Sequence, residues 1–168
     1  MSKRYKVFWG ILALSAVLLV GCARDSGDKL FEGTDMEGNA VSSDIFSQSK
    51  LTMINVWATY CGPCLREMPG LGELSEEYDA KQFQLIGIVS DVLEGEDQSY
   101  AESLIQQTGA NYPHLLLNES IYSALLTDVS AVPTTFFIDK NGAILDTVVG
   151  AMEKSAWEEK INGLLEKQ

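Results

Sequence analysis

The chain reads LTMINVWATYCGPC from Leu51 to Cys64, and this stretch decides the fold. Its first part, residues 51–58, is a near-continuous apolar run of the kind that is buried on both faces of a sheet. Two cysteines follow directly, separated by Gly62 and Pro63. Proline suits the first turn of a helix, because the N–H that it lacks would have no partner there. The order predicts a buried strand that leads into a helix with a cysteine pair at its N-terminus.

Apolar periodicity predicts the other elements. The helix after the cysteines has Leu65, Met68, Leu71 and Leu74 on one face, and Pro69 is expected to kink it. Before it we expect a hairpin over residues 31–43. After it come a strand at 83–89, an acidic loop at 90–97 and a strand at 113–117. Between the loop and the second strand we expect a helix that ends at Gly109 and carries on one face Tyr100, Ala101, Leu104 and Ile105.

The C-terminal part continues this alternation. Asn118 is expected to cap a small helix that runs to Leu126, and strands at 134–139 and 143–149 form a second hairpin. A final helix starts at Ser155, where Ser155 and Glu158 form a capping box, and it buries Trp157, Ile161, Leu164 and Leu165. Because strands and helices interleave over a length typical of one domain, the sequence predicts a single α/β domain.

Cys61 and Cys64 are the candidate catalytic residues. A sulfur at a helix N-terminus faces unpaired backbone N–H groups and the positive end of the helix dipole, which stabilise a thiolate. Thiols in Cys-x-x-Cys motifs have pKa values of about 3.5 to 7.5, so a nucleophile is available at neutral pH. We predict that Cys61 attacks a substrate sulfur and that Cys64, one turn later, resolves the mixed disulfide.

Two other roles for the cysteine pair are weaker. A structural disulfide contributes most when it closes a long loop, so a gap of two residues argues against that role. A zinc site needs about four ligands, and only His114 could join the two thiols. His114 is interpreted as a strand or loop residue and Arg66 as a surface residue. We therefore expect no metal and no cofactor.

The N-terminus has the layout of a signal peptide, residues 1–21. Lys3, Arg4 and Lys6 precede an apolar run at 7–20, which is shorter than the ~20 residues that span a bilayer. The sequence Leu-Val-Gly-Cys that ends at Cys22 resembles the bacterial lipobox, which implies cleavage before Cys22 and a lipid on its sulfur. An uncleaved anchor or plain secretion is the alternative, and each places the domain outside the cytoplasm.

The predicted organisation is a signal peptide at 1–21, a lipidated cysteine and polar linker at 22–29, and one domain at 30–168. The formal net charge of the whole chain is −12. It becomes −15 without residues 1–21, which carry three basic and no acidic side chains. Such a surface repels nucleic acid and anionic headgroups, so we expect no nucleic-acid partner and a membrane attachment that depends on the lipid.

Three stretches carry a resemblance to a known family: NVWATYCGPC at 55–64, LREMP at 65–69 and VPTTFFID at 132–139. Together they resemble the TlpA/ResA group of membrane-tethered thioredoxin-like proteins, over roughly residues 30–167. The resemblance implies an α/β thioredoxin-like fold. In it, a central mixed sheet is flanked by helices, with an N-terminal hairpin and an inserted helix.

The resemblance also implies how clients bind. Pro133 would follow a cis peptide bond from Val132 and lie against the cysteines, which exposes the Val132 backbone to an extended client segment. Trp57 would pack beside the disulfide, and Gly62 with Pro63 would let another backbone come close. The alternatives are an ordinary proline at a strand start and a tryptophan that only fills the core.

Glu67 is the third candidate catalytic residue, because the family often has a glutamate close to the sulfurs. A buried carboxyl has a raised pKa and can move protons between the cysteines. Glu67 could also be a solvated helix residue. The buried aspartate of cytoplasmic thioredoxin corresponds here to Asn55, which cannot exchange a proton, so that role falls to Glu67 or to water.

The Gly-Pro dipeptide resembles thioredoxin, whose potential of about −270 mV lies far below the −120 mV of strong oxidants with the same fold. It favours a reductase. The family implies electrons from a membrane thiol transporter of the CcdA/DsbD type, and clients such as apocytochrome c, methionine sulfoxide reductase or other oxidised exported proteins. A disulfide-forming oxidase, a peroxidase and a metal or heme chaperone are the alternatives. The cysteine spacing of copper chaperones and the peroxidatic Pro-x-x-x-Thr-x-x-Cys pattern are both missing around Cys61.

Overall fold

The structure is a computed structural model that describes residues 30–168. The predicted signal peptide at 1–21, Cys22 and the linker at 22–29 lie outside the described residues. Within residues 30–168, none of the helices has the length and apolar character needed to cross a bilayer.

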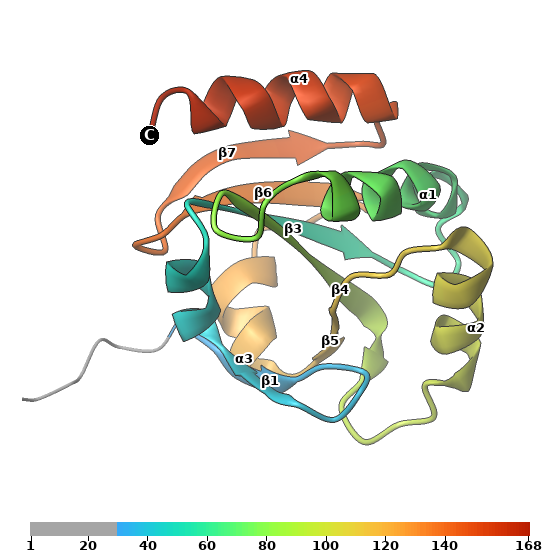
Figure 1. Cartoon of the computed structure of the whole chain (residues 1–168). Coiled ribbons are helices and arrows are strands. Elements are labelled where there is room, and N and C mark those ends of the chain that lie inside the picture. Colours follow the sequence, from blue (N-terminus) through green and yellow to red (C-terminus); the bar gives the residue numbers. More distant parts are fainter. Residues whose placement is uncertain (1–29) are drawn as a thin grey trace, which may run out of the picture.

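A five-stranded sheet with the order β5-β4-β3-β6-β7 forms the centre of the molecule (Figure 1). β3 (Leu51–Trp57) is buried along its whole length and lies in the middle, parallel to β4 (Phe83–Leu93) and antiparallel to β6 (Thr134–Asp139). β5 (His114–Leu117) is parallel to β4, and β7 (Ile144–Val149) is antiparallel to β6. The sheet is therefore mixed, as the resemblance implied.

Three helices cover one face of the sheet: α1 (Gly62–Glu77), α2 (Ser99–Thr108) and α4 (Lys154–Leu165). α1 packs against both of the others and contains Pro69, as predicted. The core on this face includes both cysteines, together with large side chains from β3, α1, β6 and α4: Trp57, Met68, Leu71, Phe137 and Trp157. α1 therefore starts at the edge of a tightly packed core.

The opposite face is covered by the N-terminal hairpin and the inserted helix. β1 (Glu32–Thr34) and β2 (Ala40–Ser42) pair antiparallel and lead into the short 3₁₀ helix η1 (Ser43–Gln48). α3 (Glu119–Ile121) begins at Asn118, whose side chain accepts a hydrogen bond from the Ile121 N–H, and continues as the π-helix η2 (Tyr122–Leu126). The predicted hairpin and the predicted cap at Asn118 are confirmed.

Three sequence predictions are wrong. β4 continues to Leu93, beyond the expected end at residue 89, because Val92 is still buried after a register shift against β5. Tyr100 is 63% exposed, since the buried face of α2 is a narrow one made by Ala101 and Leu104. α4 starts at Lys154, so Ser155 lies inside its first turn and cannot form the capping box.

Candidate active site

The two cysteines lie at the start of α1, after the short loop that follows β3. Cys61 is the N-cap of α1, and its sulfur accepts a hydrogen bond from the Cys64 N–H at 3.2 Å. The two residues form a disulfide with their Cα atoms 5.3 Å apart. Cys61 is 5% exposed and Cys64 is fully buried. An approaching molecule therefore meets Cys61, and the first turn of the helix holds Cys64 behind it.

The loop before Cys61 is held by a carboxylate of β4. Asp91 accepts hydrogen bonds from both the backbone N–H of Thr59, at 3.0 Å, and its hydroxyl group. Tyr60, between Thr59 and Cys61, is 78% exposed. Asp91 belongs to the stretch 90–97, which the sequence predicted to be an acidic loop. The structure instead gives this carboxylate a defined position next to the cysteine loop.

Pro133 follows a cis peptide bond from Val132, as the resemblance implied. β6 starts directly after it, and Thr134 pairs with Val56 near the end of β3, so the proline lies at the same end of the sheet as the cysteines. Val132 and Tyr60 line one small pocket, together with residues 129–131, η2 and residues of β3, β4 and β5. Gly62 and Pro63 are exposed at the start of α1. Val132, Gly62 and Pro63, three of the predicted client-binding residues, thus lie at the same end of the sheet.

Glu67 is buried, with only 6% of its surface exposed, so it is not a solvated helix residue. One carboxyl oxygen accepts a hydrogen bond from the Asn55 Nδ2 at 2.9 Å. The other accepts from the Met152 backbone N–H at 3.1 Å and from the Trp157 Nε1 at 3.3 Å. Burial raises the pKa of Glu67, and these three hydrogen bonds offset part of that rise.

Glu67 also has a route to solvent. It lines a cleft with Pro63, between the first turns of α1 and residues 151–154. A carboxyl with a raised pKa that lies one turn after Cys64 and borders such a cleft has the properties of a group that exchanges protons. Sequence reasoning singled out Glu67 through the family resemblance, but it missed Trp157 and Met152, because they come from distant segments of the chain.

Asn55 connects Glu67 to the central sheet. Its Nδ2 donates to Glu67 and, at 3.0 Å, to the Thr135 Oγ1 on the neighbouring strand β6. Its Oδ1 is buried without a partner among the described residues. The Asn55 amide thus orients the carboxyl group of Glu67.

Trp57 is fully buried at the end of β3 and shares a core cluster with both cysteines. Its indole Nε1 donates a hydrogen bond to His114 Nδ1 at 3.1 Å. His114 lies in β5, as the sequence suggested. Burial lowers the pKa of its imidazole ring to about 4. No signal in the sequence linked His114 to Trp57.

Fold and site together define the class of the protein: it is a thiol-disulfide oxidoreductase with a thioredoxin-like fold. Among residues 30–168, no group of three or more histidine, cysteine, aspartate or glutamate side chains is arranged to hold a metal ion. The Redoxin family model matches residues 25–165, and the chain belongs to this family.

Three relatives illustrate the family. The chain is 29% identical over 138 residues to the thiol-disulfide oxidoreductase ResA of Bacillus thuringiensis, covering 82% of this chain and 73% of that protein. It is 32% identical over 136 residues to the thiol:disulfide interchange protein DsbE of Escherichia coli, covering 81% and 69%. The exposed lipoprotein thioredoxin Etrx1 of Streptococcus pneumoniae has a similar structure, with a TM-score of 0.62 and 26% identity over 79% of this chain and 98% of that one.

Proposed function

We propose that this protein is a reductase of disulfides in exported proteins, with Cys61 as the attacking thiolate and Cys64 as the resolving thiol. The observation that carries the proposal is the Cys61 sulfur at the N-cap of α1, where it accepts the Cys64 N–H. The same N–H and the helix dipole stabilise negative charge on this sulfur once the disulfide is reduced. The greater exposure of Cys61 supports its role as the attacking residue.

The reaction has two steps. The Cys61 thiolate attacks one sulfur of the client disulfide, that bond breaks, and the second client sulfur leaves as a thiolate that takes up a proton. Cys64 then loses its proton and attacks the Cys61 sulfur, so the mixed disulfide breaks and the first client sulfur leaves as a thiolate, which is protonated in turn. Two electrons pass to the client, and the Cys61–Cys64 disulfide remains.

Glu67 accepts the proton of Cys64 in the second step. Three features support this role: its position one turn after Cys64, its raised pKa, and the cleft that it shares with Pro63. A base with a pKa raised towards neutrality combines a useful population of the carboxylate with a favourable proton transfer. Asn55 has no proton to exchange, and it positions the carboxyl by donating to it.

The client binds as an extended segment along the rim formed by Val132, Gly62 and Pro63. The position of Val132 supports this role, since it lies just before β6 begins and lines a pocket with Tyr60, the residue before Cys61. Trp57 forms the buried side of this site. ResA and DsbE, the relatives named above, are a thiol-disulfide oxidoreductase and a thiol:disulfide interchange protein, which agrees with a protein client.

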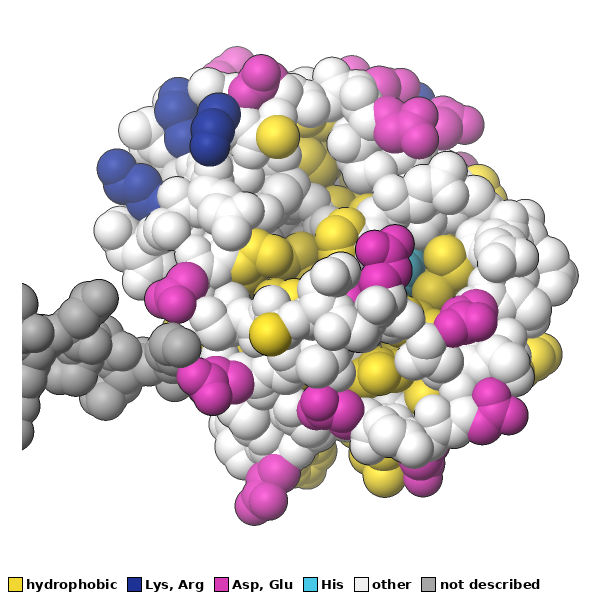
Figure 2. All heavy atoms as spheres, turned by 60° about the horizontal axis from the view of Figure 1, so that its bottom comes forward, with side chains coloured by type: hydrophobic (Ala, Val, Ile, Leu, Met, Phe, Trp, Pro, Cys, Tyr) yellow, Lys and Arg dark blue, Asp and Glu magenta, His cyan; other side chains and the backbone are white. Residues whose placement is uncertain are grey.

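The protein works outside the cytoplasm, held at the bacterial membrane by a lipid on Cys22. The sequence of residues 1–22 supports this placement, and Etrx1 is itself an exposed lipoprotein. A CcdA- or DsbD-type transporter supplies the electrons, and apocytochrome c, methionine sulfoxide reductase or other oxidised exported proteins receive them. Acidic side chains are spread over the face in Figure 2 and basic ones gather at one edge, which speaks against a nucleic-acid partner.

Trapping of mixed disulfides tests the proposal. The Cys64→Ser variant of the full chain should accumulate client proteins on Cys61, and mass spectrometry of these adducts identifies the client. The matched Cys61→Ser variant should trap far less, because Cys64 is buried. Equal trapping by both variants would show that the assignment of roles is wrong.

A redox titration against glutathione separates the reductase from an oxidase. A potential near −270 mV supports the reductase, and one near −120 mV would replace it with a disulfide-forming oxidase. A dialysed sample that retains copper, zinc or heme in proportion to protein would favour a chaperone that uses the thiols as ligands.

A further inference from the structure

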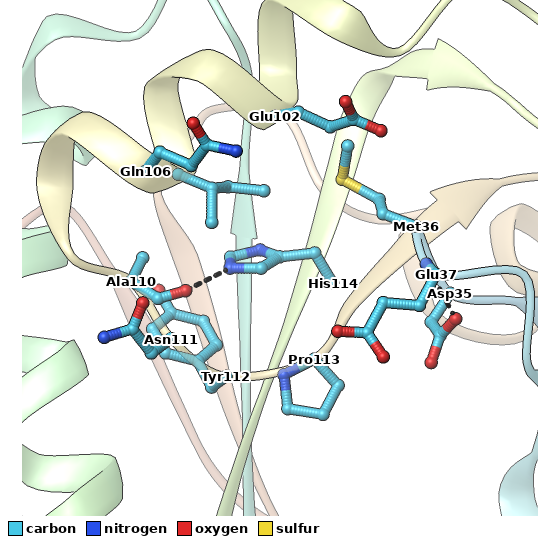
Figure 3. Close-up of a pocket in the computed structure, with 11 residues that line it drawn as sticks. Asp35, Met36, Glu37, Glu102, Gln106, Ala110, Asn111, Tyr112, Pro113 and His114 are labelled. Atoms are coloured by element: carbon cyan, nitrogen blue, oxygen red, sulfur yellow. Dashed lines mark hydrogen bonds between the residues drawn. The ribbon is translucent and has the colours of Figure 1, made fainter.

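His114 is fixed at both ring nitrogens. Nδ1 accepts from the Trp57 indole. Nε2 lies 3.1 Å from the Ala110 carbonyl oxygen, and Figure 3 shows this bond. An indole N–H can only donate and a carbonyl oxygen can only accept, so the ring is neutral with its proton on Nε2. A protonated ring would turn an N–H towards the indole N–H. Trp57 therefore depends on a neutral His114.

Gly87 makes room for this contact. It lies in β4, between Asn55 of β3 and His114 of β5 in the strand register. A Cβ at Gly87 would stand 2.1 Å from Nδ1 and 2.7 Å from Cε1 of the imidazole. The ring therefore lies across the backbone of β4, in the space that any other residue would fill, and it reaches from the edge strand to the central one.

Aromatic packing holds the ring in this orientation. The Tyr112 ring lies 4.4 Å from the imidazole, centroid to centroid, at an interplanar angle of 33°. The Trp57 ring meets it edge-on, at 5.6 Å and 80°. Figure 3 shows the ring between Ala110 and Gln106 on one side and Met36 on the other. The imidazole is thus packed on both sides, with its Nδ1 directed at the indole N–H.

Trp57 connects His114 to the part of the core that contains the cysteines. It ends β3 only four residues before Cys61, and both cysteines share its core cluster. An indole has a single N–H, which His114 satisfies, and a buried donor without an acceptor is costly. Without His114, the indole gains by turning towards another acceptor or towards water, and the wall beside the dithiol changes shape.

We propose that His114 is a positioning residue for thiol-disulfide exchange: by accepting the indole hydrogen bond, it holds Trp57 where the reacting sulfurs need it. The inference rests on the proposed function, since it deepens the account of the same dithiol. It assigns a role to a side chain that touches neither cysteine nor client, and it makes Gly87 a requirement of the site.

Two isosteric substitutions test the proposal. In His114→Asn the side-chain oxygen can take the place of Nδ1 and accept from Trp57, whereas His114→Leu has the same shape and no acceptor. Both lose the bond to Ala110. The rate constant of the reduced full chain in detergent with the aromatic disulfide DTNB should fall about fivefold in H114L, the factor that one net hydrogen bond supplies. It should stay within about twofold of wild type in H114N.

A control separates positioning from stability. Leu115 is the next residue in β5 but faces the opposite core, so Leu115→Ala weakens the same strand without touching Trp57. Its rate constant should equal that of wild type. The proposal is overturned if H114N is as slow as H114L, or if L115A slows the reaction as much. A wild-type protein that does not react with DTNB would instead refute the proposed function.

Gly87→Ala provides a second route to the same result. The new Cβ displaces the imidazole while the histidine stays in the chain, so the variant should react about as slowly as H114L. It takes the place of H114L should that variant not fold. A G87A protein that folds and reacts at the wild-type rate would contradict the proposal.

Discussion

Acidification should destabilise the protein through His114 in particular. The buried ring has a pKa of about 4, because burial disfavours the charged form, and the bond to the Ala110 carbonyl offsets only part of this effect. In the unfolded chain the pKa of histidine is about 6.5. Between these two values the unfolded state binds the proton and the native state does not.

The sign and size of the effect follow from this difference. Because the unfolded state binds more protons as the pH falls, the free energy of unfolding falls with it. For His114, pKa values of about 6.5 and about 4 correspond to a loss of about 2 kcal/mol between pH ~7.5 and pH ~5. The loss reaches about 3 kcal/mol below both pKa values, and the contribution is fully present above pH ~7.

Glu67 changes the pH dependence of the free energy of unfolding in the opposite direction, so the effect of His114 has to be measured against a reference variant. Its pKa is raised in the native state, which therefore binds the proton first and gains stability as the pH falls. Three carboxylates also line the pocket that His114 borders: Asp35 and Glu37 from the hairpin and Glu102 from α2. All of these groups are present in His114→Asn, which lacks only the histidine titration.

Urea unfolding of both proteins, measured from pH ~7.5 to pH ~5, isolates the histidine. The difference in free energy of unfolding between wild type and H114N should shrink by about 2 kcal/mol over this range. A difference that stays constant would mean that the ring accepts a proton in the native state as easily as in the unfolded one. The neutral ring and its bond to Trp57 would then be refuted.

Three further substitutions have defined outcomes. Glu67→Gln should slow release of the mixed disulfide by ~100-fold in stopped-flow measurements, because an amide cannot take up the proton of Cys64. Gly72→Ala should cost about 2 kcal/mol in urea unfolding, since its Cβ would lie 2.2 Å from the Gly109 carbonyl oxygen and a backbone atom cannot move aside cheaply. Asp91→Ala should lower stability by about 1 kcal/mol and speed hydrogen exchange of the Thr59 amide, whose acceptor it removes. Unchanged values in these three measurements would contradict the respective contacts.

Local signals made much of the fold predictable. β3 is apolar at nearly every position because both of its faces are buried, and proline after the first cysteine marks the start of α1. The capping-box prediction was wrong because tertiary packing, and not the local signal, decides where α4 starts. Ser155 and Glu158 have the right spacing, but α4 begins one residue earlier, with its first turn placed by the packing of Trp157 against the sheet and of Lys154 against α1.

The surroundings of the candidate site depend on contacts between distant segments. Glu67 carries no local sign of burial, since its acceptor role depends on Trp157 and Met152, more than 80 residues away in the chain. The cis bond before Pro133 came from family resemblance alone. His114 was interpreted as an ordinary strand residue, because only the sheet register places it beside Gly87 and within reach of Trp57.

The strand register also connects the two side chains that position groups near the dithiol: His114, which contacts Trp57, and Asn55, which contacts Glu67. His114, Gly87, Asn55 and Thr135 follow one another across four adjacent strands. The missing side chain at Gly87 lets the imidazole lie across β4, while Asn55, on the next strand, reaches Glu67 on α1. One polar row of the sheet thus orients both the indole before Cys61 and the carboxyl after Cys64. Because His114 and Asn55 lie in the same row, substitutions at the two positions should couple. Their combined effect on the rate constant of thiol-disulfide exchange should differ from the product of the single effects.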